Sequence, residues 1–162
     1  MRIIGVDPGT AIIGWGVVDE IGGKLVAIAY GHISTPAKME LSERLLIIEA
    51  ELTKILQQWE PEESSVEELF FFNNQKTAIS VAQARGVILL TLRHFHVNVV
   101  GYTPLQVKQA MTSYGKADKR QVQLMVKSVL NLEDIPKPDD VADALALAVC
   151  HTNARKMRLV RK

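Results

Sequence analysis

The chain has 162 residues, of which 48% are hydrophobic and 23% charged, and its formal net charge is +1. These values are typical of one globular domain with a substantial core, and they exclude a disordered or fibrous protein. The single cysteine, Cys150, excludes an internal disulfide and a cysteine metal cluster.

The first third of the chain predicts three strands and one helix. "RIIGVD" (2–7) reads as a buried strand that ends at the turn Asp7-Pro8-Gly9. Two more strands are predicted at 12–20 and 24–34, joined by the hairpin glycines Gly22 and Gly23. The stretch 40–59 predicts an amphipathic helix. Its apolar residues at helical spacing are Leu41, Leu45, Ile48, Leu52 and Ile55.

The remaining chain alternates strands with helices. We expect a strand at 64–72, a helix at 76–95 and a strand at 97–102. Thr103-Pro104 is a favourable N-cap and first-turn pair for a short helix, and after the loop 113–117 Asp118 can cap a helix at 119–130. A last helix should begin near Asp140 and give way to a basic tail at 155–162. The sequence therefore predicts an α/β domain at 1–154, with a mixed five-stranded sheet and helices on both faces.

The helix expected from Thr77 to Phe95 is apolar almost all round. A helix that covers only one face of a sheet would carry a polar stripe. It is therefore either enclosed within the domain or packed against a second copy of the chain, and we favour a homodimer.

Charge is distributed unevenly along the chain. Residues 1–81 carry six basic and twelve acidic groups, net −6, whereas residues 82–162 carry thirteen basic and six acidic groups, net +7. This polarity favours a basic surface for an anionic partner beside an acidic region for cations, although a mixed solvated surface explains it equally well. The longest apolar run, "GVILLTL", is too short to span a bilayer, and "MRIIGVDPG" does not resemble a signal peptide. We expect a cytoplasmic protein without a membrane partner.

Carboxylates fall at the points where predicted elements end or begin. Asp7 ends the first strand, where α/β sheets place ligands, but it can also simply stabilise a turn. Glu67 or Glu68 lies in the fourth strand, where a buried carboxylate without a partner would cost free energy. Alternatively, this is an edge strand and both glutamates face solvent. Asp140 and Asp143 share one helical face, where the helix dipole alone explains Asp140 well and Asp143 less well.

Taken together, these acids predict an oxygen-only metal site. Hard divalent cations such as Mg²⁺ or Mn²⁺ prefer this ligand type. Two such ions about 3.5–4 Å apart can clamp a phosphodiester for attack by water. A cation between Asp140 and Asp143 would also relieve the repulsion of their charges.

Five segments resemble the successive motifs of the RuvC Holliday-junction resolvases. They are "IIGVDPGTAIIGWGVV", "VEELFF", "AQARGV", "TPLQVKQAMTSYGKADKRQVQLMV" and "DDVADALALAVCH", and they span nearly the whole chain in family order. The resemblance implies a ribonuclease-H-like fold, a homodimer, and a structure-selective endonuclease that cuts four-way DNA junctions by paired, metal-dependent nicks in recombination and repair. It further implies two Mg²⁺ ions per active site, with Mn²⁺ also plausible, and association with the branch-migration complex RuvA–RuvB.

The resemblance also implies which acids are catalytic. Carried over by motif, the residues that bind metal and act in catalysis are Asp7, Glu67, Asp140 and Asp143. Asp139 matches no motif position and is expected to cap the helix.

Glu67 is preferred to Glu68 because the family glutamate follows one apolar residue and precedes a phenylalanine by three, here Val66 and Phe70. The lead-in "PEESS" departs from the family's apolar pattern, so the start of the strand is open, and the two glutamates face opposite ways.

Basic and aromatic residues around the motifs predict DNA contacts. They are Phe70, Lys76, Arg85, Lys108, Lys116, Lys119 and Arg120. In the resemblance, Lys108 and Lys119 hold the scissile strand, and Phe70 stacks on bases near the exchange point. Alternatively, the phenylalanines at 70–72 are all core, and Lys119 and Arg120 merely begin an exposed helix.

Three rival functions fit parts of the sequence. "VDPGT" resembles the phosphate loop of actin-like nucleotide-binding proteins, but these need two such subdomains, more than 162 residues hold. The second rival is a ribonuclease-H-like RNA nuclease, and the third is a catalytically silent junction-binding module. The complete set of four acids argues against a silent module.

Overall fold

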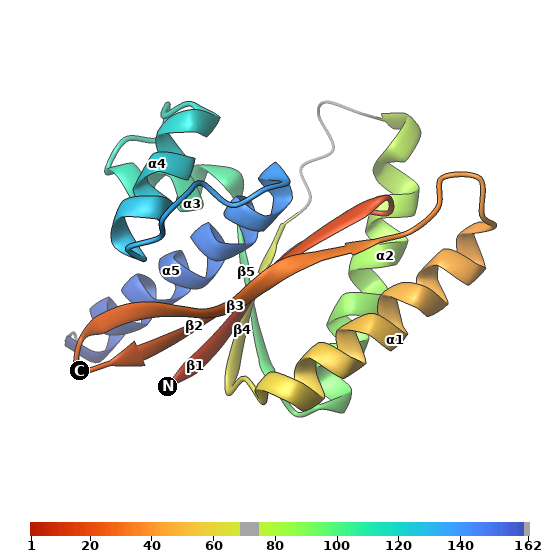
Figure 1. Ribbon diagram of the computed structural model, residues 1–162, viewed down its shortest axis with the longest axis horizontal. Coiled ribbons are helices and arrows are strands. Elements are labelled where there is room, and N and C mark those ends of the chain that lie inside the picture. Colours follow the sequence, from red (N-terminus) through yellow and green to blue (C-terminus); the bar gives the residue numbers. More distant parts are fainter. Residues whose placement is uncertain (69–74, 161–162) are drawn as a thin grey trace.

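The computed structural model describes residues 1–68 and 75–160, and the side chains of all of these except 75, 76 and 157–160 (Figure 1). Its strands are β1 (Arg2–Asp7), β2 (Ile12–Ile21), β3 (Lys24–Ser34), β4 (Glu63–Glu67) and β5 (Asn98–Tyr102). Its helices are α1 (Leu41–Trp59), α2 (Gln75–His94), α3 (Pro104–Thr112), α4 (Lys119–Val129) and α5 (Asp139–Val160).

The five strands form one mixed sheet in the order β3-β2-β1-β4-β5. β2 pairs antiparallel with both β1 and β3, and the turn between β2 and β3 places Gly22 and Gly23 at positive φ. β4 runs parallel to β1 and to β5, because the intervening helices return the chain to the same end of the sheet. The parallel strands β1 and β4 therefore end side by side.

Helices cover both faces of this sheet, as the sequence predicts. α1 and α2 pack together on one face, while α3, α4 and α5 lie on the other (Figure 1). Each face has its own buried apolar cluster: Ile48, Leu52 and Ile88 belong to the first, and Val126 and Leu145 to the second. The expected fold of a mixed five-stranded sheet between helices is confirmed.

Helix α5 lies directly against the backbone of β1 and β2. A Cβ added to Gly5 would come 1.9 Å from the carbonyl oxygen of Ala144, and one added to Gly14 would come 1.9 Å from that of Asp140. Both distances are far below van der Waals contact, so only glycine allows the helix to sit this close. The start of α5 is thereby fixed over the ends of the central strands.

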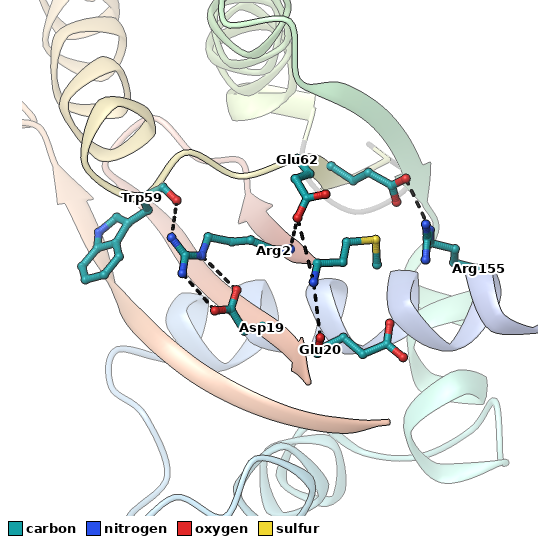
Figure 2. Close-up of polar contacts among 8 residues, drawn as sticks. Arg2, Asp19, Glu20, Trp59, Glu62 and Arg155 are labelled. Carbon is teal, nitrogen blue, oxygen red and sulfur yellow. Dashed lines mark hydrogen bonds and ion pairs between the residues drawn. The ribbon is translucent and has the colours of Figure 1, made fainter. Parts of the chain in front are cut away.

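Ion pairs hold the opposite end of β1. The Arg2 guanidinium donates to both carboxylate oxygens of Asp19, at 2.9 Å each, and to the carbonyl oxygen of Trp59 at 2.8 Å (Figure 2). At the same end, Arg155 of α5 lies 3.4 Å from Glu63 at the start of β4. These contacts connect the sheet with α1 and α5 far from the strand ends that carry the predicted acids.

Two element boundaries differ from the sequence prediction by more than one residue. β4 begins at Glu63 and ends at Glu67, so Glu68, which the strand expected at 64–72 includes, lies outside it. The last helix does not end at residue 154. It continues to Val160 and includes most of the basic stretch expected as a tail. Phe70 and its neighbours at 71 and 72 lie outside the described residues. In the part of the chain that the structure describes, no helix is long and apolar enough to cross a membrane.

Candidate active site

Asp7 and Glu67 stand side by side at the ends of parallel strands. Val6 of β1 is in register with Val66 of β4, so the next residue of each strand reaches the same edge of the sheet. Burial raises the pKa of the Asp7 carboxyl well above its ordinary value, and the negative charge of Glu67 raises it further. The Asp7 carboxyl, which keeps its proton to higher pH, hydrogen-bonds to Glu67. Two half-buried acids therefore share one small volume.

Glu67 and Glu68 point to different surroundings. Burial is the largest cause of the raised pKa of Glu67, followed by the charge of Asp143. The Glu68 side chain instead is exposed and lies over the backbone of Gly101 in β5, where an added Cβ would come 2.6 Å from its Oε1. Arg85 of α2 fixes the end of β4 by donating from Nε to the carbonyl oxygen of Glu67 at 2.9 Å. The geometry favours Glu67 as the partner of Asp7.

The first turns of α5 bring Asp140 and Asp143 to the same place. Asp143 and then Asp140 contribute to the raised pKa of Asp7, so their charges act on the strand-end acids. Burial is the main cause of the raised pKa of Asp143, although Lys119 opposes it. The four acids predicted from sequence thus influence one another electrostatically.

A pocket of about 210 Å³ opens beside this acidic group. Its walls come from the end of β4 and from α3, α4 and α5. The lining residues are Glu67, Pro104, Val107, Lys108, Lys119, Val122, Asp143 and Leu147. Two acids and two lysines therefore meet over an apolar floor, an arrangement that can hold an anionic group together with a cation.

Lys119 already neutralises part of the acidic group. Its Nζ lies 3.0 Å from Oδ2 of Asp143 and 3.5 Å from Oδ2 of Asp139. Burial alone would lower the pKa of Lys119, but the two carboxylates outweigh it and raise the pKa above its ordinary value. Lys119 thus stays charged at the mouth of the pocket.

Among the described side chains, no three acidic, histidine or cysteine groups are already arranged as a closed metal site. The chemistry of the donor set nevertheless fits a divalent cation. Asp7, Glu67 and Asp143 carry raised pKa values because their negative charges are partly buried together, and a cation would relieve that cost. Carboxylate oxygens are the ligands that Mg²⁺ and Mn²⁺ prefer.

The other predicted DNA contacts are spread around this pocket. Lys108 of α3 lines it, whereas Lys116 and Arg120 are exposed on the nearby loop and on α4. Arg85 contacts the backbone of Glu67 and so supports the site from inside the protein. The side chain of Lys76 and the whole of Phe70 lie outside the described residues.

Sequence reasoning missed one contact at the site, and it left open where one histidine of α5 lies. Asp139, expected only to cap the helix, forms an ion pair with Lys119. His151 is buried and connects two strands, because its Nδ1 lies 2.9 Å from the Tyr102 hydroxyl and its Nε2 lies 2.7 Å from Glu63. The sequence alone left His151 as either a structural or a surface residue.

The raised pKa of Asp7 predicts how stability depends on pH. In the unfolded chain the carboxyl titrates near its ordinary pKa of about 3.9. Between that value and the raised folded pKa, the folded protein binds more protons than the unfolded chain, so stability falls as pH rises. Asp7→Asn removes this loss.

In EDTA, Asp7→Asn should therefore melt above the parent at neutral pH, by roughly a few degrees, and this gain should shrink as pH falls toward 4. Melting curves at several pH values measure it. A difference in melting temperature that is independent of pH would show that ionisation of Asp7 does not destabilise the folded protein.

Comparison with known proteins gives a consistent result. Residues 3–151 match the family described as "Crossover junction endodeoxyribonuclease RuvC". A curated protein of that name from Halothermothrix orenii is 52% identical over 157 residues, covering 97% of this chain and 95% of that protein.

Solved structures agree with the sequence relatives. The structure of RuvC from Thermus thermophilus is 35% identical, with a TM-score of 0.89, and covers 98% of this chain and 97% of its own. The T. thermophilus protein in complex with a Holliday junction substrate is 34% identical, with a TM-score of 0.88. The match covers 97% of this chain and 96% of the T. thermophilus chain.

Proposed function

The chain belongs to the RuvC family of crossover junction endodeoxyribonucleases, and from this premise we propose that it resolves four-way DNA junctions by paired Mg²⁺-dependent nicks. Its ribonuclease-H-like fold is shared with the T. thermophilus protein solved on a Holliday junction. Family membership favours DNA over RNA as the substrate and an active nuclease over a silent binding module.

The observation that carries the proposal is the meeting of acids and lysines at one edge of the sheet. Glu67 and Asp143 line the same pocket as Lys108 and Lys119, and Asp7 lies beside them at the end of β1. A phosphodiester needs cationic groups on its oxygens and an activated water at phosphorus. The two lysines would supply cationic groups, and the acids would hold the Mg²⁺ that activates the water.

The acidic and the basic residues then have distinct roles. Asp7, Glu67, Asp140 and Asp143 would hold the metal, two ions per site, and Mg²⁺ supplies a polarised phosphate and a water of lowered pKa. Lys108 and Lys119 neutralise the charge of the scissile strand at the mouth of the pocket. The exposed Lys116 and Arg120 extend this basic surface along the DNA backbone. For Lys76 and Phe70, the expected DNA contacts rest on the family resemblance alone.

The direct test compares substrates in the same buffer. The protein is incubated with a synthetic four-way junction and with linear duplex of the same arm sequence, in Mg²⁺ and in EDTA. We expect symmetrical nicks in two opposed strands of the junction, only with Mg²⁺, and an intact duplex. Equal cutting of the duplex, or cutting in EDTA, would refute the proposal.

We also propose that the enzyme is a two-fold homodimer through α2. Ala84, Ile88 and Leu92 point into the domain, whereas Ile79 is 72% exposed and Leu90 57% exposed on the outer side. Large apolar side chains on both sides of one helix indicate a second packing partner. A two-fold dimer would present two active sites to opposed strands of a four-way junction.

Leu90→Glu should convert the dimer into monomers. Burying a leucine contributes about 1.5–3 kcal/mol, and a two-fold interface contains it twice, so the dimer should weaken by roughly 10²–10⁴-fold. Light scattering at micromolar concentration measures the mass against 18.0 kDa for one chain. Ile21→Glu, at a residue 61% exposed at the end of β2, is the matched control and should leave the mass unchanged. A parent protein that is already monomeric would contradict the proposal.

Association with the branch-migration complex RuvA–RuvB and a cytoplasmic location complete the proposed function. Both rest on family membership. Of the basic residues that α5 carries beyond residue 154, Arg155 pairs with Glu63 and Lys156 with Glu20.

A further inference from the structure

We propose that Asp139 is a positioning residue that receives the Lys119 ammonium when Asp143 turns to a metal ion. The proposal rests on the function proposed above, since it requires Asp143 to be a metal ligand. It assigns a role to an acid that matches no motif position and that the sequence indicated only as a helix cap.

The ammonium of Lys119 lies between two carboxylates of different exposure. Its distances are 3.0 Å to Asp143, whose side chain is 30% exposed, and 3.5 Å to Asp139, whose side chain is 60% exposed. Asp139 and Asp143 are one turn apart on α5, so they face the same neighbour. One lysine therefore bridges an acid of the active site and an acid at its rim.

The base of Lys119 is held firmly, whereas its amine ends a long and flexible side chain. Asp118 caps α4 by accepting from the Gln121 N–H at 2.8 Å, and the Gln121 side chain accepts from the Asp118 N–H at 2.8 Å. This reciprocal cap fixes the first residue of α4, which is Lys119, against α5. The long side chain can then exchange between Asp143 and Asp139 without any movement of the helices.

A metal ion and the ammonium cannot share Asp143 without repulsion. Lys119 pairs with Oδ2 of Asp143, which lines the pocket, and among the described side chains no three acids are grouped as a finished metal site. We therefore expect metal binding to move the lysine. Asp139 is already within ion-pair distance and gives the ammonium a second partner at the rim of the pocket. Lys119 and Lys108 both line this pocket, so the displaced ammonium would lie where a DNA phosphate binds.

A simpler explanation is that Asp139 acts only through its charge. An added carboxylate at the start of α5 would favour any nearby cation and would be stabilised by the helix dipole. In that case its effect on metal affinity would not depend on Lys119. The two explanations therefore differ in the coupling between the two residues, which a double-mutant cycle measures.

The experiment is calorimetric titration of Mn²⁺ into the parent, Asp139→Asn, Lys119→Met and the double variant. We expect Lys119→Met to bind Mn²⁺ more tightly, because the competing ammonium is gone. Asp139→Asn should bind about fivefold or more weakly, and this loss should fall below about twofold when Lys119 is already methionine. Asp134→Asn, which removes an exposed acid elsewhere on the chain, is the control and should match the parent.

An equal loss from Asp139→Asn in both backgrounds, or no loss in either, would overturn the inference. Melting curves in EDTA check that all variants are folded, since ion pairs this exposed contribute little to stability. If the parent binds Mn²⁺ and cuts junctions while the cycle is additive, only the role of Asp139 fails. If the parent binds no Mn²⁺, the proposed metal site and this inference fail together.

Discussion

Asp7→Asn, Glu67→Gln, Asp140→Asn and Asp143→Asn should each lower the rate of junction cleavage by about 10³-fold or more. Loss of one ligand removes several kcal/mol of transition-state stabilisation, and each 1.36 kcal/mol corresponds to a factor of ten. Junction binding should persist, because affinity comes mainly from phosphate contacts with basic residues. The metal-free variants should also melt no lower than the parent, since each substitution relieves repulsion within the acidic group.

Glu68→Gln is the matched control for this series. Its side chain lies over Gly101 and not toward Asp7, so cleavage should remain near the parent rate. Full cleavage by Glu67→Gln together with loss of cleavage in Glu68→Gln would show that Glu68, and not Glu67, is the catalytic glutamate. If the four acids merely cap helices and turns, their variants would show small stability losses and no shared loss of cleavage.

Gly14→Ala should damage both stability and cleavage, although it lies outside the acidic group. Its Cβ would come 1.9 Å from the carbonyl oxygen of Asp140 and 3.0 Å from the amide nitrogen of Val141. Neither backbone atom can move without shifting the first turn of α5. We expect a loss of about 1–3 kcal/mol in the free energy of unfolding, together with strongly reduced cleavage, because Asp140 and Asp143 move with the helix.

Gly31→Ala is the control for this prediction. There the nearest atom to an added Cβ is in the Trp15 indole ring at 3.1 Å, a side chain that can shift by a few tenths of an ångström. It should cost little stability and leave cleavage intact. Melting temperature and junction cleavage are measured for both variants. A Gly14→Ala protein that melts and cuts like the parent would show that α5 does not set the position of the acids.

The sequence predicts the strand ends and helix starts that carry the site, because local signals mark them. β1 ends at Asp7 as expected, and the Thr103-Pro104 cap and the cap at Asp118 are both formed. The end of β4 at Glu67 could not be predicted, because the sequence after it is apolar and compatible with a continuing strand.

Tertiary contacts supply what the sequence pattern leaves open. Glu67 and Glu68 are adjacent acids in one strand segment, and only the position of β5 shows that Glu68 lies over Gly101. The bridge from Lys119 to Asp139 joins the starts of two helices, and nothing local in either segment marks it. The close approach of α5 to Gly5 and Gly14 likewise depends on the packing of elements far apart in the chain.

The most direct test of the metal-dependent nuclease site is cleavage of a four-way junction by the double variant Asp140→Asn/Asp143→Asn. Its melting temperature in EDTA and its junction affinity are measured on the same preparation, so that folding and binding are known. The proposed site predicts a folded protein that binds the junction and makes no nicks in Mg²⁺ or Mn²⁺. Cleavage near the parent rate would contradict it, because the chemistry would then not require the two acids that α5 brings to the strand ends.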